Sequence, residues 1–399
     1  MKILAAVMGC LSIVVVLLDA FEAIVLPRRV TRRLRLTGFF FSLTWTPWAA
    51  LARHISKRKQ REAYLGFYGP LSLIVLLIVW AVGLILGFAM LHWALGSKIH
   101  VADGEAASFA SDLYMSGMTF FTLGLGDLVP FTTLGRLFTV IEAGTGFGFL
   151  AIIIGYLPVI YQAFSRREVN ISLLDARAGT PSTAAELLRR HGRDGSMESL
   201  NQLLQDWERW SSDLMESHLS YPVLSYYRSQ HDNQSWLAAL TTILDTCALV
   251  IVGVDNAPAW QAQLTFAMAR HAVVDISQVV NARPKQPEYN RLTPEQLASL
   301  RRTLAGAGVP LRDGADADHR LAELRAMYEP YIKSLSDEML MPLPPWIIEK
   351  EAVDNWQTSA WERNPKALAE NFTRACQKGK AEAIKVKEVK EKRERVQVK

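Results

Sequence analysis

The chain has 399 residues, half of them hydrophobic, and a formal net charge of +5 at pH 7. Its mean hydropathy of +0.10 is high for a soluble protein and low for a chain of membrane helices alone. The composition therefore predicts a membrane part joined to a larger soluble part. Three widely spaced cysteines predict neither a disulfide framework nor a metal site, and the modest charge gives no reason to expect a nucleic-acid partner.

Three apolar segments, residues 3–26, 68–93 and 137–163, are long enough to cross a bilayer. A cleaved signal peptide is the alternative for 3–26, but no small-residue cleavage site precedes the basic stretch that follows it. A fourth apolar segment, 236–253, carries Asp245 near its middle. A charge at the centre of a bilayer is costly, so we expect a buried core helix there and three membrane spans in all.

Basic residues gather in the segment 27–65, whereas the loop 97–133 holds a single lysine. The positive-inside rule therefore places 27–65 and the C-terminus in the cytoplasm. We expect the chain to lie in the plasma membrane of a bacterium. Arg29, Arg32 and Arg35 recur at every third position. No spanning helix surrounds them, so we expect a membrane anchor and not a voltage sensor.

The short segment 38–52 is apolar and aromatic but only about 15 residues long, too short to span. Basic runs stand on both sides of it. We expect an interfacial helix lying on the cytoplasmic leaflet, with Trp45 and Trp48 at the depth of the headgroups.

The stretch MTFFTLGLGDLVPFTTLGR, residues 118–136, lies between the second and third spans. We expect a short helix over 109–121 that enters the membrane from outside and stops partway, followed by extended backbone that returns outward. Glycines at 124 and 126 allow φ values closed to other residues, so successive carbonyls can face one side. Rings of such carbonyls can replace the hydration shell of an ion. Close helix packing through glycine is the alternative, but these glycines lie outside the apolar runs.

This stretch resembles the pore loop of the potassium channel family, whose filter reads Thr-Val-Gly-Tyr-Gly-Asp. Thr119 matches the threonine of the family's pore helix, and Pro130 with the Gly135-Arg136 pair resembles the link into the inner helix. The resemblance covers about residues 66–165. It implies an all-α membrane protein with a re-entrant pore helix, a homotetramer in the lipid bilayer, K⁺ as the permeant ion and no cofactor. The filter positions implied by the match are Thr122, Leu123, Gly124, Leu125, Gly126 and Asp127.

One departure from the family concerns Leu125, which stands where the family has tyrosine. The backbone carbonyls remain, but the phenol that braces the family's filter is lost, so a weakly selective cation channel is an alternative. We hypothesise that Glu142 packs behind the filter and accepts hydrogen bonds from the pore helix, partly replacing that brace. The competing interpretation is a carboxyl near the extracellular interface.

The third span contains Gly146 at the position of the family's hinge glycine. Phe147, Leu150 and Ile154 follow at helical spacing and are expected to line an apolar cavity below the filter, where a dewetting gate is possible. Ordinary helix packing is the alternative for the same side chains.

The sequence after residue 165 predicts a helical part in the cytoplasm. We expect this part to regulate the pore in response to a ligand that the sequence does not identify. The expected organisation is a transmembrane helix (1–26), a basic interfacial segment (27–65), a pore domain (66–165), a helical domain (166–283), a further helical region (284–377) and a charged tail (378–399).

Two other function classes compete with the channel. The order of His218, His231, Asp232 and Asp275 resembles the helical metal-dependent phosphohydrolases, in which such residues hold metals that activate water. The glycine and lysine that usually follow the His-Asp pair are absent, so we expect no enzyme and no metal. A structural membrane protein with a degenerate pore is the third class, and it predicts no ion flux.

Overall fold

The protein is mostly helical in a computed structural model that describes residues 1–26, 36–96, 99–101, 108–193, 197–254, 257–348 and 354–357. Arg29, Arg32, Arg35 and the tail 378–399 lie outside these residues. The elements in chain order are α1 (Lys2–Ala20), a π-helical turn (Phe21–Val25), α2 (Leu36–Arg53), α3 (Arg58–Leu95), β1 (Ile99–Val101), α4 (Phe109–Phe120), β2 (Leu128–Pro130), α5 (Thr133–Ala178), α6 (Ala184–Arg193), α7 (Met197–Ser220), a 3₁₀ turn (Pro222–Tyr226), α8 (Trp236–Gly253), α9 (Ala259–Val279), α10 (Pro294–Gly306), α11 (Ala315–Ala326), α12 (Glu329–Met339) and a 3₁₀ turn (Asn355–Gln357).

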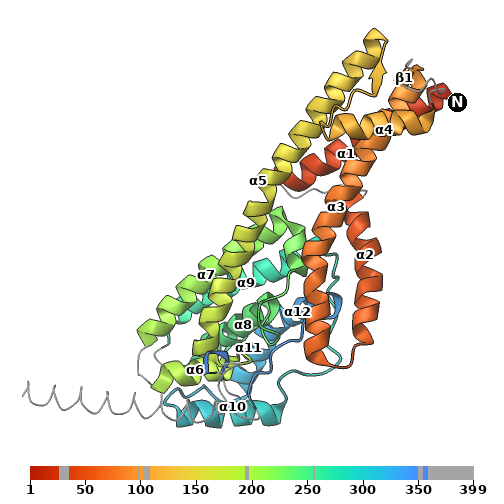
Figure 1. The fold of residues 1–399 in the computed structure, drawn as a ribbon. Helices are drawn as coiled ribbons and strands as arrows, with labels where there is room; N and C mark the ends of the chain where they lie inside the picture. The colour runs from red at the N-terminus through yellow and green to blue at the C-terminus, as the bar shows by residue number, and fades with distance from the viewer. Residues whose placement is uncertain are drawn as a thin grey trace, which may run out of the picture.

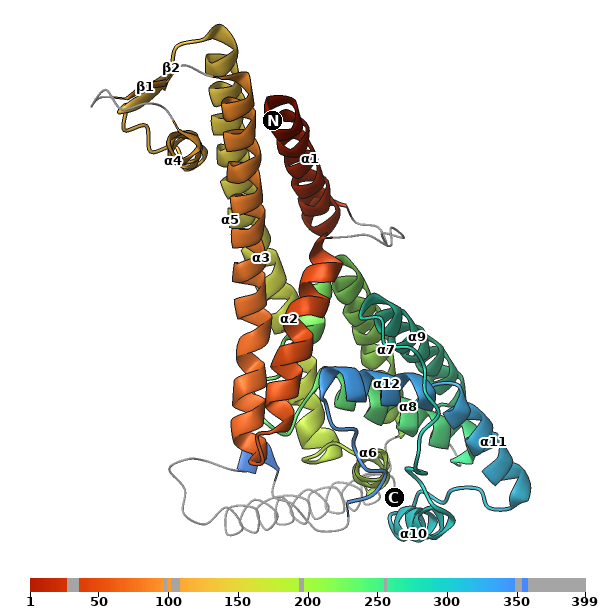
Figure 2. The ribbon, with the colours of Figure 1, turned by 90° about the vertical axis from the view of Figure 1, so that its right-hand side faces the viewer.

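Two long helices, α3 and α5, run through the molecule and join its two ends (Figure 1). With 38 and 46 residues they are about 57 and about 69 Å long, roughly twice the thickness of a bilayer core. In their upper halves α3 packs with α1 and α4, and α5 packs with α4 (Figure 2). Lower down, α3 contacts α2, and α5 contacts α6, α7 and α8. The segments expected to span are therefore helical, and two of them continue well beyond the expected ends.

Among the residues that the structure describes, four helices are long and apolar enough to cross a membrane by length and composition: α1 with its π-helical turn, α3, α5 and α8. The last of these is different, because 83% of its most apolar stretch is buried inside the protein. Asp245 of α8 is 2.8 Å from the Arg291 guanidinium and accepts a hydrogen bond from the Tyr328 hydroxyl. A charge neutralised in this way suits a protein core, and α8 packs as the core helix that its aspartate predicts.

The segment 38–52 is helical as expected, but the expected position of Trp45 at headgroup depth is wrong. Helix α2 lies alongside the lower half of α3 (Figure 2), and its aromatic face is covered by protein. Trp45 is 4% exposed and its Nε1 donates to the Glu338 carbonyl at 3.0 Å. Its ring packs on Tyr68 and Tyr226, and Trp48 stacks on Tyr64. Tyrosines of α3 and of the C-terminal region therefore bury the aromatic side chains that the sequence alone assigns to lipid headgroups.

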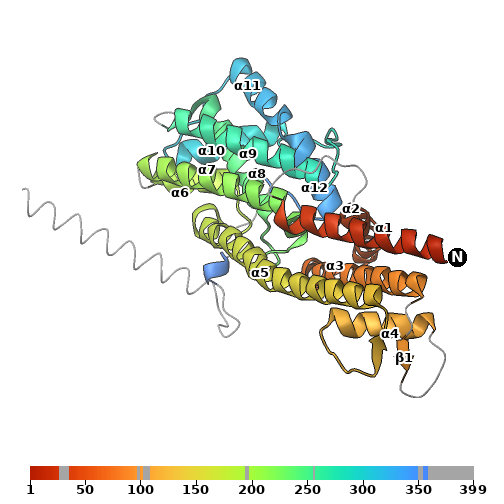
Figure 3. The same ribbon diagram turned by 90° about the horizontal axis from the view of Figure 1, so that it is seen from above.

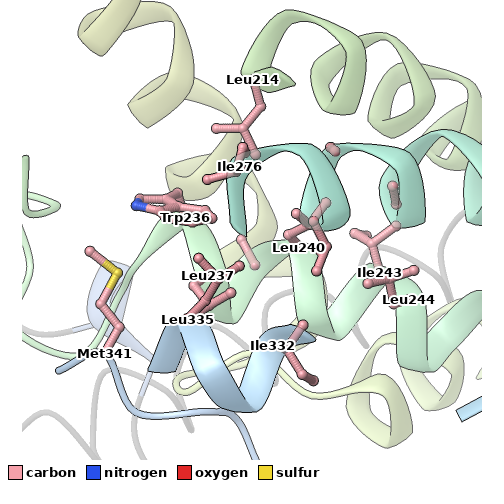
Figure 4. Packing of buried hydrophobic residues seen from close by; sticks show 14 of the residues in the cluster. Leu214, Trp236, Leu237, Leu240, Ile243, Leu244, Ile276, Ile332, Leu335 and Met341 are labelled. Carbon is pink, nitrogen blue, oxygen red and sulfur yellow. The ribbon is translucent and has the colours of Figure 1, made fainter. Parts of the chain in front are cut away.

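The C-terminal region is built around α8. Its apolar side chains contact α7, α9 and α12, as Figure 4 shows for Trp236, Leu240, Ile276 and Ile332. One core therefore continues across residue 283, because α8 lies before it and α10 to α12 after it. Arg291 inserts into the same core beside Asp245. The expected division at 283/284 is not a structural boundary.

Two further expected boundaries also fall inside helices. The boundary at 65/66 lies in α3 and the boundary at 165/166 lies in α5. Two helices of the C-terminal region show local sequence signals. Thr293 caps α10 in a capping box with Gln296, and α7 buries Leu200, Leu203, Leu204, Trp207 and Trp210.

Candidate functional site

The candidate pore element begins with α4, which contacts both α3 and α5. Seen from above, α4 and β1 lie on the other side of α3 and α5 from α7 to α11 (Figure 3). Ser108 and Ser111 form a capping box at its start, and the helix ends at Phe120, close to the expected end at residue 121. Two backbone bonds then turn the chain out of the helix: the Thr122 N–H donates to Thr119 at 3.0 Å, and the Leu123 N–H donates to Met118 at 2.8 Å.

The six residues expected to form the filter follow this turn as non-helical backbone. Every second residue has a left-handed φ: 55° at Thr122, 62° at Gly124 and 78° at Gly126. Glycine adopts this conformation without a Cβ penalty, whereas for threonine it is strained. Leu123 and Leu125 alternate with them and are 62% and 65% exposed. Within one chain, this loop is therefore an open segment with alternating backbone conformation.

The exit of this loop is held at both sides. The Asp127 carboxylate accepts the Leu128 N–H at 3.1 Å and also interacts with the Tyr114 hydroxyl of α4. Strand β2 then pairs antiparallel with β1, with Val129 opposite His100. This two-stranded ribbon connects the end of the loop to the segment after α3.

The start of α5 is fixed at the same place. The Thr132 hydroxyl accepts the Gly135 N–H at 3.0 Å as a helix cap. The Arg136 Nε donates to the Pro130 carbonyl at 3.1 Å. The proline, threonine, glycine and arginine singled out in the sequence thus form one local turn between β2 and α5.

A buried polar cluster lies between α3, α4 and α5. Glu142 of α5 is fully buried and accepts a hydrogen bond from the Ser116 hydroxyl of α4. Its other oxygen is 3.3 Å from Nε2 of His92 on α3, which is also fully buried. Asp112, one turn before Ser116, is 4% exposed. One carboxylate thus links the three helices that carry the loop, close to the end of α4.

Sequence reasoning missed His92, Asp112 and Ser116 in this cluster. A signal was available for the first two, because an ionisable residue in an apolar segment is a functional candidate by default. Asp19 of α1 carries the same signal. It is fully buried, accepts the Thr37 hydroxyl at 2.5 Å and accepts Nε1 of Trp80 at 3.0 Å. It joins α1 to α2 and α3.

Gly146 faces the last turn of α4. A Cβ added there would lie 2.0 Å from the Phe120 carbonyl oxygen, which no side chain can tolerate. Helix α5 continues through this residue without interruption. The structure therefore gives Gly146 a packing reason, the close approach of α5 to α4, and the hinge that the resemblance implies stays a prediction.

The cavity residues expected on α5 divide into two sets. Phe147 and Ile154 are 69% and 73% exposed, whereas Leu150 is half-buried. Val140 and Tyr161, at 70% and 69%, extend the exposed pair at intervals of seven residues. Two turns of an α-helix contain about seven residues, so these four side chains form one stripe. We call Val140, Phe147, Ile154 and Tyr161 the α5 stripe.

The segment after α7 joins the lower ends of α5 and α3. Arg167 of α5 is 4% exposed and donates to the carbonyls of Leu224 at 2.9 Å and Tyr227 at 2.8 Å. The next residue, Arg228, forms an ion pair with Glu62 of α3 at 3.5 Å. Residues 222–228, called the bridge segment below, thereby connect Arg167 in the lower part of α5 with Glu62 in the lower part of α3.

The four residues of the phosphohydrolase pattern do not form a metal site. Among the residues that the structure describes, no group of three or more His, Cys, Asp or Glu side chains is placed to hold a metal ion. His218 is fully buried next to Arg167 and Trp236, and burial lowers its pKa to about 3. His231 and Asp232 are exposed in a turn, and Asp275 is 3.2 Å from His271. The structure therefore does not bring the four residues of this pattern together as a set of ligands.

Comparisons with known proteins agree with the geometry of the upper region. Residues 73–162 match a family model described as "Ion channel". The chain is 23% identical over 193 residues to the "Uncharacterized membrane protein YdjJ" of Bacillus subtilis (strain 168), which covers 48% of this chain and 56% of the relative. The chain thus matches little more than half the length of that curated relative. No solved structure gives a significant match. Residues 73–162, from within α3 to the lower half of α5, are therefore similar to an ion-channel family, and part of the chain is similar to a membrane protein.

Proposed function

We propose that the chain is one subunit of a potassium-selective channel, and that four copies surround a single pore in the membrane with their C-terminal regions in the cytoplasm. The observation that carries this proposal is the alternation of left-handed φ at Thr122, Gly124 and Gly126. It occurs directly after a helix that lies between two long apolar helices. This backbone conformation can turn successive carbonyls toward one side.

The mechanism follows from the carbonyl ligands. A ring of carbonyl oxygens compensates a dehydrated K⁺ ion, and several rings in series let one ion displace the next. One chain supplies one loop, so a closed ring needs several copies, and four is the number that the family resemblance implies. The exposed Leu123 and Leu125 support assembly, because neighbouring copies would cover these apolar side chains.

Selectivity depends on how rigidly the rings are held. Leu125 donates no hydrogen bond, but Ser116 of α4 donates to Glu142 of α5, and Tyr114 of α4 interacts with Asp127 at the end of the loop. We assign the bracing of the filter to these two contacts. A weakly selective cation channel is the second candidate, and the leucine at position 125 is the observation that favours it.

The gate is assigned to the α5 stripe. Four exposed apolar side chains on one line of α5 suit a helix that faces the pore axis, where an apolar constriction closes by dewetting. The bridge segment joins the lower end of this helix to the C-terminal region through Arg167. We therefore propose gating by the C-terminal region and not by a voltage sensor.

The test is K⁺ flux into proteoliposomes that contain the purified full-length chain. Wild type should take up K⁺, and Gly126→Ala should not, because alanine is disfavoured at φ 78°. Chemical cross-linking should trap tetramers of both proteins, which separates a filter defect from failed assembly. Equal flux through both proteins would refute the proposed pore, and absence of flux from an assembled wild type would favour a structural protein.

A further inference from the structure

A cavity lies where the lower ends of α3 and α5 meet the C-terminal region. Its volume is about 140 Å³. Glu62 of α3 and Asp175 of α5 contribute to its wall, Arg228 follows the bridge segment's 3₁₀ turn, and the segment Pro342–Pro345 closes another side. Its wall thus combines parts of both long helices with the domain proposed to regulate them.

One carboxylate oxygen in this wall has no hydrogen-bond partner among the described residues. Glu62 is 9% exposed, and its Oε2 forms the ion pair with Arg228. Its Oε1 is buried and has no hydrogen-bond partner among the residues that the structure describes. A buried carboxylate oxygen without a donor is unfavourable, and native structures rarely keep one unless a ligand or water satisfies it.

The positive groups of the wall are already engaged by the protein. Arg228 donates to the Leu340 carbonyl at 3.3 Å and to the Met339 carbonyl, in addition to its pair with Glu62. Arg58 donates to the Asp232 carbonyl at 3.4 Å. Two arginines and three carboxylates, those of Glu62, Asp175 and Asp232, line the cavity, and Arg61, the chain neighbour of Glu62, also attracts it. The charges are therefore close to balanced, and the unpartnered acceptor Oε1 of Glu62 favours a ligand that brings N–H donors.

The rest of the wall is apolar. Ile171, Leu174, Ala238, Leu343 and three prolines of the Pro342–Pro345 segment line it. An apolar cavity of about 150 Å³ accommodates one benzene molecule, so a ligand here has roughly five to ten non-hydrogen atoms. A charged head with a short hydrocarbon body matches both halves of the wall.

We propose that this cavity binds a small organic cation, an alkylammonium or alkylguanidinium, whose N–H groups donate to Oε1 of Glu62 while its hydrocarbon body lies against the proline and leucine wall. Such a ligand stabilises the present arrangement of α3 and α5, because both helices contribute to the site. An effect on ion flux rests on the proposed channel function, whereas binding itself does not.

The test is isothermal titration calorimetry of the full-length protein in detergent micelles. The probes are n-butylammonium and n-butylguanidinium, with n-butanol and butyrate as the neutral and anionic probes of similar length. At least one of the two cations should bind saturably, one per chain, and neither n-butanol nor butyrate should. Glu62→Gln should weaken that binding by about tenfold or more, as expected for loss of a charge-assisted hydrogen bond.

Two further variants keep the result interpretable. Ala238→Leu fills the cavity without touching the carboxylate and should abolish binding. Glu186→Gln removes a carboxylate that pairs with Arg189 and Arg190 outside the cavity, and it should bind like wild type. If Glu62→Gln fails to fold, as judged by circular dichroism, Ala238→Leu decides the outcome.

The proposal is overturned if neither cation binds wild type, if n-butanol binds as well as the cations, or if binding survives in Glu62→Gln or Ala238→Leu. Gly126→Ala should bind the cation like wild type. Cation binding without K⁺ flux in wild type would therefore refute the channel and leave this site standing, and flux without binding would do the reverse.

Discussion

The Glu142 carboxylate of α5 accepts a hydrogen bond from the Ser116 hydroxyl of α4, and this one contact joins the two helices on either side of the loop 122–127. Both residues are fully buried. The contact lies inside the segment that matches the ion-channel family model, and the second carboxylate oxygen lies 3.3 Å from Nε2 of His92 on α3. Helices α3, α4 and α5 thus meet at the side chain of Glu142.

Replacing Glu142 by glutamine should lower the selectivity for K⁺ over Na⁺ while leaving the chain folded. The amide keeps the shape of the side chain but is a weaker acceptor, and loss of a charged hydrogen bond costs about 1.5–3 kcal/mol. The ratio of K⁺ to Na⁺ flux in proteoliposomes measures this effect. Glu198→Gln, at an exposed position of α7, is the control and should keep the wild-type ratio. An unchanged ratio in Glu142→Gln would refute the bracing role.

Replacing Gly146 by alanine should force α5 away from α4. The added Cβ would lie 2.0 Å from the Phe120 carbonyl oxygen, and backbone cannot yield as a flexible side chain can. We expect a loss of stability of about 3 kcal/mol, at the upper end of the range for overpacking, and loss of ion flux. Gly148→Ala is the matched control, because a Cβ there meets nothing within 4 Å of its own chain. Equal thermal midpoints for the two variants would contradict the assigned packing role.

The sequence predicts α1, α3 and α5 well, because a helix long enough to cross a bilayer needs about 20 apolar residues in a row. Glycines at 124 and 126 also identify correctly where the backbone leaves the regular conformations. The left-handed φ of Thr122 could not be foreseen, because threonine disfavours it and only the turn after α4 imposes it. The packing reason for Gly146 depends on a helix 26 residues earlier in the chain, which no local pattern encodes.

The failures share one physical cause. An apolar aromatic face is equally suited to lipid headgroups and to a protein partner, so the pattern of α2 cannot tell Tyr226 from a membrane. The order of four histidines and aspartates likewise fixes no distances between them. Asp245 was informative because a charge in an apolar helix requires a partner, although the sequence did not identify that partner as Arg291.

Replacing Asp245 by asparagine should destabilise the C-terminal region by about 3 kcal/mol, the lower end of the range for breaking a buried pair, because Arg291 loses its closer carboxylate and keeps Glu329 at 3.4 Å. Chemical denaturation of the full-length protein followed by tryptophan fluorescence measures the change. Asp206→Asn removes a surface pair with Arg209 at 3.9 Å, and it should change stability by no more than about 0.5 kcal/mol. Similar effects from the two substitutions would show that the buried network contributes little.

His218 should make the protein less stable in mild acid. Burial lowers its pKa in the folded chain from 6.5 to about 3, so between these values the unfolded chain binds a proton that the folded chain does not. Stability therefore falls as the pH decreases below about 6.5, and between pH 7.5 and 5.5 this one group accounts for about 1.4 kcal/mol. Denaturation midpoints of wild type and His218→Gln at the two pH values measure the effect. The variant should lose less stability on acidification, and equal losses would contradict the assignment.

The most direct measurement of the central claim is the reversal potential of the reconstituted full-length chain in a planar bilayer, with K⁺ on one side and Na⁺ at equal concentration on the other. A K⁺-selective pore should give a reversal potential far from zero, close to the equilibrium potential of K⁺. Gly126→Ala should carry no such current. A reversal potential near zero in wild type would contradict potassium selectivity and leave a weakly selective cation channel.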